Sequence, residues 1–500
     1  MSLDNALFNA TSGLRHTSRQ IAIASHNLSN AGTDGYSRKT VAGESLMLGG
    51  VKSQEARRDV DLALRAAARG AQSNSASMEL RASVLGPLAK LQGDPEDGRS
   101  LGGLVGELRD TLTALRTDPG ESAMQNQALR AAEEAAYKLN MVGNGIRRAR
   151  QDAHDGLITD VGVANNLIKD IARLDREVRA EFAAGRTGAD AQDRRDAAIG
   201  KLSAYLDVRS IPTGTPGGIN LVIGSGTIIP MDERKNILSI PSAVIGSDTT
   251  SATFGLRVNG RELPNTTWGG RIGERFDLRD RTLPRMEAEV DMVASVLATR
   301  LDEQGLRLFT EADGLSVPPR AIAPGSPQAI LGFASRIRVN TDVAAQPALM
   351  RDGTPSAAGY TPPPSPVPAG YVTLLNKVIT YAFGDKPGPG PATHPPIPGG
   401  GLGPDTMALL NSRFAPPNRI VDYAAAVSGA HASEAADADR LLDDAKGFST
   451  HITGLVQRRE GVDMDQEMAA MVQLQNAYSA NARVMATVQT MWDSLLAAVR

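Results

Sequence analysis

The fold is decided by the C-terminal stretch that begins Glu460-Gly461-Val462-Asp463-Met464-Asp465-Gln466-Glu467-Met468 and ends at Arg500. Written as a helix, this stretch places one stripe of apolar residues at Met464, Met468, Met471, Leu474, Tyr478, Ala482, Met485, Val488, Met491, Leu495 and Val499. The average spacing is about 3.5 residues, which is typical of a coiled-coil seam. This helix is therefore expected to pair with another helix.

A second seam lies at the N-terminus. Intervals of four and three residues alternate along Leu3, Leu7, Ala10, Leu14, Thr17, Ile21, Ala24 and Leu28. At about 1.5 Å per residue this segment would be roughly 40 Å long. We expect the two ends of the chain to pair as a coiled coil, with everything between them forming one large excursion from that pair.

Composition narrows the functional classes. The chain has 53 Lys and Arg against 56 Asp and Glu, a net charge of -3, so it has no field that would attract nucleic acid or an anionic membrane. It has no cysteine, which excludes disulfides, thiolate metal sites and cysteine nucleophiles. The N-terminus lacks the pattern of a secretory signal, and no apolar run is long enough to span a bilayer. We expect either a cytosolic protein or export without a cleaved signal.

The middle of the chain changes character four times. Amphipathic helical patterns give way to short β-prone runs with Gly and Pro, then to helix, then to an extended Pro-rich stretch, then to helix again. The predicted fold is α+β, mainly α, with nested domains. We assign 1–50 plus 460–500 to a terminal coiled-coil assembly domain, 51–207 plus 282–310 plus 402–459 to a helical bundle, 208–281 to an inserted β domain, and 311–401 to an extended, Pro-rich surface excursion.

Enzyme chemistry finds little support. The six histidines have no close metal-ligand spacing, and there is no cysteine to complete a site. An acidic group on one predicted helix lacks the glycine-centred loop of a calcium site, so a solvated helix face is favoured; it comprises Glu434, Asp437, Asp439, Asp443 and Asp444. We therefore expect no catalytic residue, no cofactor and no metal.

Two stretches carry a family resemblance. Residues 7–38, which contain Ser25-His26-Asn27-Leu28-Ser29-Asn30 and Gly35-Tyr36-Ser37-Arg38, resemble the amino-terminal signature of bacterial flagellar axial proteins. Residues 461–468 and 475–484 resemble their carboxy-terminal signature. The Gly-Tyr-Ser-Arg ending, the long helical middle, Asp193-Arg194-Arg195-Asp196 and residues 276–284 are most similar to the FlgK-type family of hook-associated proteins.

This resemblance implies a structural role in the bacterial flagellum. It implies concentric domains, export through the flagellar type III apparatus with an export chaperone and without signal cleavage, and an extracellular location. It also implies self-assembly at the distal end of the hook, at the hook–filament junction. The implied partners are copies of the same chain, hook protein and another hook-associated junction protein, with neither nucleic acid nor membrane.

The terminal seams are the candidate assembly interface. Between Gln473 and Trp492 only Arg483 is charged, so the outer face of the last helix is expected to meet other subunits or to line a narrow passage. We assign the interface to Leu3, Leu7, Leu14, Ile21, Leu28, Met464, Met468, Met471, Leu474, Tyr478, Met485, Val488, Met491 and Leu495. The alternatives are a hook or rod subunit, which would share these signatures, or a flagellum-associated wall hydrolase or adhesive protein.

Overall fold

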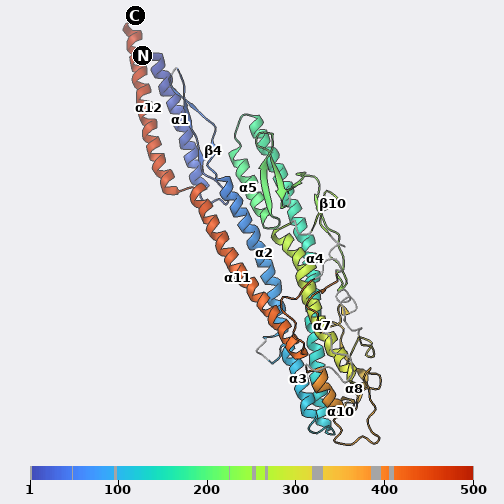
Figure 1. Cartoon of the computed structure of the whole chain (residues 1–500). Coiled ribbons are helices and arrows are strands. Elements are labelled where there is room, and N and C mark those ends of the chain that lie inside the picture. The colour runs from blue at the N-terminus through green and yellow to red at the C-terminus, as the bar shows by residue number, and fades with distance from the viewer. Residues whose placement is uncertain are drawn as a thin grey trace.

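The computed structural model describes residues 3–47, 49–94, 98–224, 226–250, 255–264, 268–317, 330–384, 396–404 and 410–498, and only the backbone of Leu3. The molecule is a long rod with both termini at the same end (Figure 1). Long helices make up most of it, and the sheets have two or three short strands. The mainly α fold class is therefore confirmed.

The two ends of the chain pair as expected. Helices α1 (Leu3–Ser29) and α12 (Met464–Ala498) lie side by side at one end of the rod (Figure 1). They run antiparallel, because Asn27 bonds Glu467 while Gly13 faces Asn481 further along. At Gly13 the helices are so close that an added Cβ would lie 3.1 Å from the Asn481 amide.

Two hairpin-like pairs follow α1 and lie beside it. β1 (Lys39–Thr40) pairs with β4 (Arg57–Arg58), and β2 (Gly43–Ser45) pairs with β3 (Val51–Ser53). The Val51 amide donates to Ser12 Oγ at 3.1 Å, and Ser53 Oγ lies 2.9 Å from His16 Nδ1. Residues 51–58 therefore accompany α1, which differs from their expected place in the helical bundle. The division of the chain at 50 and 460 stays a prediction.

The body of the rod is built from six long or medium helices. They are α2 (Leu62–Gln92), α3 (Leu101–Leu115), α4 (Ser122–Ala183), α5 (Ala189–Ser203), α7 (Leu283–Glu303) and α11 (Ile420–Glu460). Asp61 caps α2 by accepting hydrogen bonds from the Ala63 and Leu64 amides. α11 packs along α2, so chain segments from before and after the β-rich part come together as expected (Figure 1).

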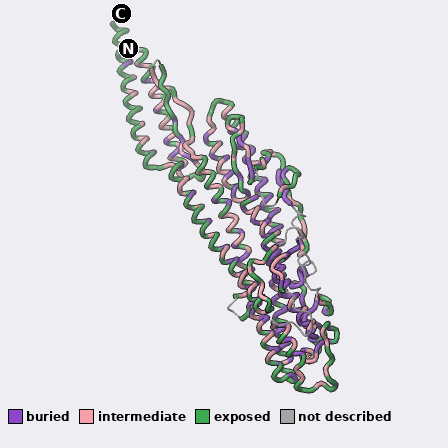
Figure 2. Tube along the Cα trace, in the orientation of Figure 1, coloured by how far each residue is buried: buried purple, intermediate pink, exposed green. Residues whose placement is uncertain are grey.

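α4 is the longest element and passes through both hydrophobic cores. With 62 residues it extends over roughly 90 Å at about 1.5 Å per residue. Its first half, including Leu139 and Ile146, belongs to the larger core, and its second half, including Leu157 and Ile168, belongs to the smaller one. Figure 2 shows buried segments inside the body, whereas the terminal pair is mostly exposed or half-buried.

The β-rich insertion packs on the second half of α4. One sheet has the order β5 (Val208–Pro212), β6 (Ile219–Ile223), β7 (Thr227–Ile229). The other has the order β10 (Arg261–Glu262), β9 (Arg257–Val258), β8 (Leu238–Ser239). Asn165 of α4 fastens β8 by accepting from the Leu238 amide and donating to the Leu238 carbonyl.

The expected end of the β insertion at 281 is wrong in detail. Residues 270–282 form α6 (Gly270–Asp277) and a π-helical turn, η3 (Leu278–Thr282), which lead directly into α7. Gly269 and Gly270 form a turn before α6, with positive φ angles of 59° and 56°. Ile272 and Phe276 then follow at helical spacing and are buried in the smaller core.

The stretch assigned to a surface excursion contributes to the larger core. Phe333, Leu375, Val378 and Phe383 are all buried there. The short elements that carry this stretch are β11 (Phe309–Thr310), β12 (Arg338–Val339), α8 (Thr341–Ala345), α9 (Leu349–Asp352), α10 (Thr373–Lys377) and the π-helical turn η5 (Val378–Ala382). Its Pro-rich composition hid these few apolar anchors. Residues 385–395, which belong to the Pro-rich part of this stretch, lie outside the described residues.

The close approach of α3 to α11 gives a test of the packing. A Cβ on Gly102 would lie 2.6 Å from Ala425 Cα, whereas a Cβ on Gly106 would meet only the Val421 side chain at 3.6 Å. Gly102→Ala should lower the free energy of unfolding by about 1–3 kcal/mol, because the helices must separate. Gly106→Ala should leave it unchanged or raise it by up to about 1 kcal/mol, because alanine favours helix. Chemical denaturation measures both, and equal effects would contradict this packing.

Candidate assembly site

On α1 the contact with α12 is made largely by small residues. The fully buried positions are Ala10, Thr17, Ala24 and Asn27. The larger residues of the predicted seam are half-buried, namely Leu7, Leu14, Ile21 and Leu28. The Leu3 side chain lies outside the described residues. Small side chains at the closest points allow the two helices to approach, while the leucines flank the contact.

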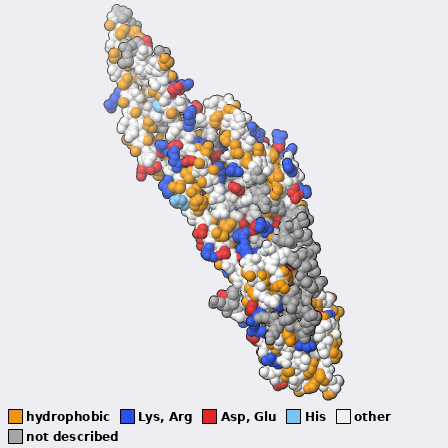
Figure 3. Space-filling model, in the orientation of Figure 1, with side chains coloured by type: hydrophobic (Ala, Val, Ile, Leu, Met, Phe, Trp, Pro, Cys, Tyr) orange, Lys and Arg blue, Asp and Glu red, His pale blue; other side chains and the backbone are white. Residues whose placement is uncertain are grey.

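On α12 the predicted seam divides into two sets. Val488 is buried and Met471, Leu474 and Met485 are half-buried, so these residues form the inner face. The remaining predicted residues are 43–53% exposed; they are Met464, Met468, Tyr478, Met491 and Leu495. Apolar side chains thus remain on the surface of the terminal pair (Figure 3).

The last turns of α12 extend beyond α1. Because Asn27 meets Glu467 and Gly13 meets Asn481, the antiparallel register carries α12 past the start of α1 after about Met491. Figure 1 shows this extension at the C-terminal end. Trp492, Leu495 and Leu496 lie on it and are 36%, 50% and 58% exposed. Among the described residues, the extension is therefore an apolar end without an α1 partner.

The terminal pair is joined to the body by a cluster of polar residues, here called the polar junction, which comprises Asn27, Tyr36, Ser37, Arg38, Lys39, Arg58, Arg65, Asp193, Asp196, Glu460 and Glu467. The contacts of the polar junction nearest to α1 are made by Asn27. The Asn27 amide donates to the Lys39 carbonyl at 2.9 Å and to Glu467 Oε2 at 3.2 Å. The Asn27 oxygen accepts from the Tyr36 hydroxyl at 2.8 Å and from the Lys39 amide at 3.0 Å.

Asp193 of α5 is the centre of the polar junction. It accepts from Ser37 Oγ at 2.7 Å, from the Ser37 amide at 3.2 Å and from Lys39 Nζ at 2.9 Å. Arg58 Nη1 lies 3.0 Å from Asp193 and 2.7 Å from Asp196. One buried carboxylate therefore holds the loop after α1 and the strand before α2 against α5.

Two glutamates connect the C-terminal helices to the same cluster. Glu460, the last residue of α11, accepts from Arg65 Nε at 2.5 Å and from the Asp61 amide at 2.8 Å. Glu467 in the first turn of α12 accepts from Arg38 Nε at 2.6 Å. The Arg38 amide donates to the Glu460 carbonyl at 2.8 Å. The break between α11 and α12 is thus held at the place where α1 ends.

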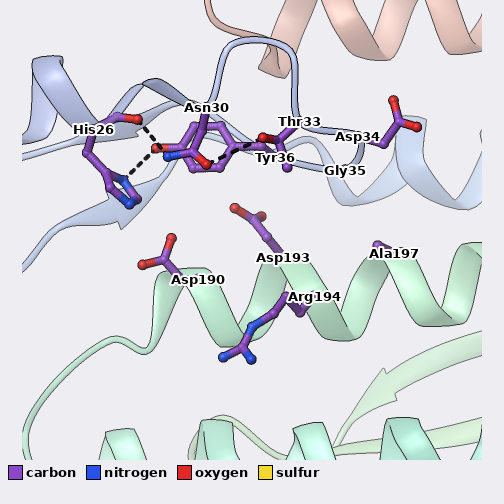
Figure 4. Close-up of a pocket in the computed structure, with 10 residues that line it drawn as sticks. All are labelled: His26, Asn30, Thr33, Asp34, Gly35, Tyr36, Asp190, Asp193, Arg194 and Ala197. Carbon is purple, nitrogen blue, oxygen red and sulfur yellow. Dashed lines mark hydrogen bonds between the residues drawn. The ribbon is translucent and has the colours of Figure 1, made fainter. Parts of the chain in front are cut away.

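A pocket of about 270 Å³ lies beside this cluster (Figure 4). His26, Asn30 and Tyr36 line it from α1 and the following loop, and Asp190 and Asp193 line it from α5. His26 Nδ1 lies 3.0 Å from the Tyr36 hydroxyl oxygen, which fixes the aromatic ring. The Lys39 ammonium lies 3.4 Å from the centre of that ring, an arrangement typical of a cation–π contact.

Gly35 allows this loop to lie against α5. Its φ angle is +78°, and an added Cβ would lie 3.0 Å from Ala197 Cβ. A side chain here would be strained and would push the loop away from α5. The Gly-Tyr-Ser-Arg segment, which follows the end of α1, therefore connects the terminal pair to α5.

The electrostatics of the cluster follow from burial and pairing. Burial alone would raise the pKa of Asp193, but the hydrogen bonds from Ser37 and Lys39 outweigh it and hold that pKa below its ordinary value. Burial, together with the charges of Asp190 and Asp193, raises the pKa of Tyr36. Tyr36 therefore stays a neutral hydrogen-bond donor and Asp193 stays ionised at neutral pH.

No group of three or more His, Asp or Glu side chains in the described part of the chain could hold a metal ion. Within the same residues, no helix is long and apolar enough to cross a membrane. The geometry around the terminal pair is that of a contact surface and its attachment.

Comparison with known proteins agrees with this geometry. A family model described as the flagellar hook-associated protein FlgK helical domain matches residues 88–310. The flagellar hook-associated protein 1 of Bacillus subtilis (strain 168) is 20% identical over 526 aligned residues, which cover 95% of this chain and 94% of the relative. This chain is thus similar to FlgK-type flagellar hook-associated proteins over its helical region and, at low identity, over nearly its whole length.

Two further likenesses concern parts of the chain. The model of the C-terminal region of flagellar basal body rod FlgEFG proteins matches residues 458–498, which include Glu460, Glu467 and α12. The structure of the flagellar hook junction protein FlgK from Burkholderia pseudomallei is 19% identical with a TM-score of 0.41, and the alignment covers 50% of this chain and 45% of that one.

The charged members of the polar junction are what sequence reasoning missed. Asp193 and Asp196 were noted in a segment similar to the FlgK-type family, but no contact was assigned to them. Glu467 offered one signal, because it is a carboxylate next to an apolar seam. In the structure Glu467 is only 2% exposed. Its partners Asn27 and Arg38 lie more than 400 residues earlier, so sequence spacing could not identify them.

Removing the Asp193 charge tests the polar junction. Asp193→Asn should lower the free energy of unfolding by about 3 kcal/mol, because Lys39 and Arg58 lose a buried partner. Asp190→Asn is the matched control: its side chain is 61% exposed and also pairs with Lys39, at 2.8 Å, so its effect should stay within about 1 kcal/mol. Urea denaturation of both variants measures the difference, and similar losses would contradict the central role of Asp193.

Acidification should remove the contribution of the ionised Asp193 to the stability of the fold. Because the folded-state pKa of Asp193 is depressed, its stabilisation is present above the unfolded-state pKa of about 3.9 and is lost as pH falls through the folded-state value. The Tm difference between wild type and Asp193→Asn should therefore be constant near neutral pH and shrink below about pH 4. Thermal unfolding from pH 7 to pH 3 measures it. A difference that persists at the lowest pH would show that Asp193 acts without its charge.

Proposed function

We propose that this protein is a structural subunit that forms the hook–filament junction of the bacterial flagellum by self-assembly at the distal end of the hook. The observation that carries the proposal is the terminal pair, which holds exposed apolar side chains at one end of the rod. The match of residues 88–310 to the FlgK helical-domain model and the near full-length similarity to a flagellar hook-associated protein 1 support it.

Exposed apolar area explains why the terminal pair should associate. Met468, Val472, Met491, Leu495 and Leu496 are each 48–58% exposed. Burying apolar surface contributes roughly 25 cal/mol per Å², and clustered exposed patches of this kind mark interaction surfaces. Contact with neighbouring copies would remove this surface from water.

The polar junction sets the direction in which that surface points. Arg38, Asp193 and Glu460 connect the end of α1 to α5 and α11, so the terminal pair has a defined orientation relative to the body. A subunit that must fit between fixed neighbours needs such an orientation. We assign the exposed predicted residues to contacts between subunits, and the half-buried ones to pairing within the chain.

The proposal includes partners and a location. The partners are copies of this chain, hook protein and another hook-associated junction protein, and the location is the flagellum outside the cell. Passage through the flagellar export apparatus with an export chaperone and without a cleaved signal is part of the proposal. The protein is proposed to be structural and not an enzyme; release of muropeptides from peptidoglycan by the purified protein would contradict this.

One alternative keeps a specific observation in its favour. The match of residues 458–498 to the C-terminal region of rod FlgEFG proteins fits a hook or rod subunit as well. The two functions differ in the polymer formed. Isolated hooks mixed with the purified protein should gain one short distal layer that stops growing, visible by electron microscopy. Long self-extending polymers would favour the hook or rod alternative.

A charge on the apolar extension should block this layer. Leu495→Lys should prevent its addition to hooks, because an exposed lysine cannot be buried against an apolar neighbour without a large desolvation cost. The unfolding free energy of the monomer should change by less than about 0.5 kcal/mol, because Leu495 is exposed. Ser494→Lys, on a neighbouring exposed position, is the control and should still assemble. Normal layers with Leu495→Lys would remove the extension from the interface.

A further inference from the structure

A second surface lies below the terminal pair, in a groove formed by α2, α5 and α11. Its volume is about 800 Å³, and it is closed at one end by the loop 31–36. Arg69 and Gln72 line it from α2, Gly200 and Lys201 from α5, and Gln457 from α11. We call it the α2–α5–α11 groove.

The groove lining carries three cations and three carboxylates, and two of the three charges left without an ion pair among the described residues are positive. Of its lining residues, Arg65, Asp196 and Glu460 are already paired with one another, at 2.8 Å and 2.5 Å. Arg69 and Lys201 take part in no ion pair among the described residues, and Asp34 is the opposing carboxylate at the rim. Arg69 Nε is buried without a hydrogen-bond partner, and burial lowers the pKa of its guanidinium. A carboxylate brought into the groove would satisfy this group.

The complementary surface lies on α11 itself. Leu441 and Phe448 are 50% and 55% exposed and are seven residues apart, so they lie on one side of the helix. Asp444 lies between them, is exposed, and takes part in no ion pair within the described residues. These three residues form what we call the outer α11 stripe, an apolar pair with a central negative charge.

Geometry prevents the stripe from reaching the groove of its own chain. At about 100° per residue, Phe448 lies roughly opposite Gln457 around the axis of α11. The stripe and the groove therefore open on opposite sides of one continuous helix. The outer α11 stripe of a second copy has the properties that the groove requires. It offers large apolar side chains for the groove and a free carboxylate for Arg69 and Lys201.

We propose that the α2–α5–α11 groove of one copy binds the outer α11 stripe of the next copy, with Phe448 entering the groove and Asp444 contacting Arg69 and Lys201. The two surfaces differ, so the contact is heterologous and can repeat around a ring or helix. Because Asp444 and Gln457 are thirteen residues apart, successive copies would be staggered by about 20 Å along α11. This inference rests on the proposed function and describes how its layer is held together below the terminal pair.

Site-specific cross-linking tests the contact directly, because the chain has no cysteine of its own. Gly200→Cys and Phe448→Cys are made as separate single variants, one carrying a mass tag, and mixed with isolated hooks and a short bismaleimide. Gly200 is suited to this because its Cβ would meet nothing within 4 Å. The expected product is a heterodimer of the two variants. Gly162→Cys on α4, which is exposed and likewise has open space at its Cβ, is the control and should not cross-link to Phe448→Cys.

Two cross-linking results would overturn the inference. One is a layer on the hooks without the heterodimer. The other is a homodimer of Phe448→Cys alone, which would mean that two stripes meet symmetrically.

Charge reversal gives an independent readout. Lys201→Glu and Asp444→Lys should each raise the protein concentration needed for the layer by about tenfold, and the double variant should restore it. Both residues are exposed, so folding measured by circular dichroism should be unchanged. Failure of the double variant to recover would contradict the pairing.

The two proposals fail in different ways. If the wild type adds a layer but all groove variants behave like it, the junction function stands and the groove contact is wrong. If the wild type adds no layer, the junction function is wrong. The cross-link is then measured in a concentrated solution of the protein alone, where its absence would also remove the groove contact.

Discussion

The architecture depends on one buried carboxylate. Asp193 lies on α5 in the body, yet it binds the backbone and side chain of Ser37 and the ammonium of Lys39, which belong to the terminal part of the chain. Charge-assisted hydrogen bonds of this kind are stronger and more directional than apolar contacts. The coiled-coil pair could slide or rotate on apolar packing alone. The carboxylate fixes where the pair begins and how it is oriented relative to the rod.

Different types of contact have different roles along the rod. Within the body, apolar residues on α3, α4, α7 and α11 exclude water and give most of the stability. At the polar junction, charged residues are used instead, which costs desolvation but specifies one geometry. On the terminal pair, apolar residues are left partly exposed. Stability and orientation are thus located in two successive regions of the rod, and we propose that the exposed side chains of the third region serve association.

The sequence predicts the helices and their pairing well, because heptad spacing is a local signal. The pairing of the two chain ends follows from it, and the amphipathic patterns predict that helices from before and after the β-rich part come together. The antiparallel direction of the end pair and the packing of α11 along α2 are seen only in the structure. The sequence could not tell which residues of α12 face α1, since Met471 and Met468 have the same chemistry and differ only in position on the helix. It also misjudged residues 270–281, where two glycines masked a helix, and the stretch around Phe333 and Phe383, where Pro-rich composition hid buried aromatics. The polar junction could not be predicted from the sequence, because the residues that pair in it are far apart along the chain.

The continuity of α4 has a consequence for cooperativity. The same helix supplies Leu139 to one core and Leu157 to the other, and its backbone hydrogen bonds run between them without interruption. Neither core can therefore open fully without fraying the helix that supports its neighbour. The two cores consist of different residues but share one helix. A force applied at one end of the rod is therefore transmitted through the covalent and hydrogen-bonded backbone of that helix and not through a flexible linker.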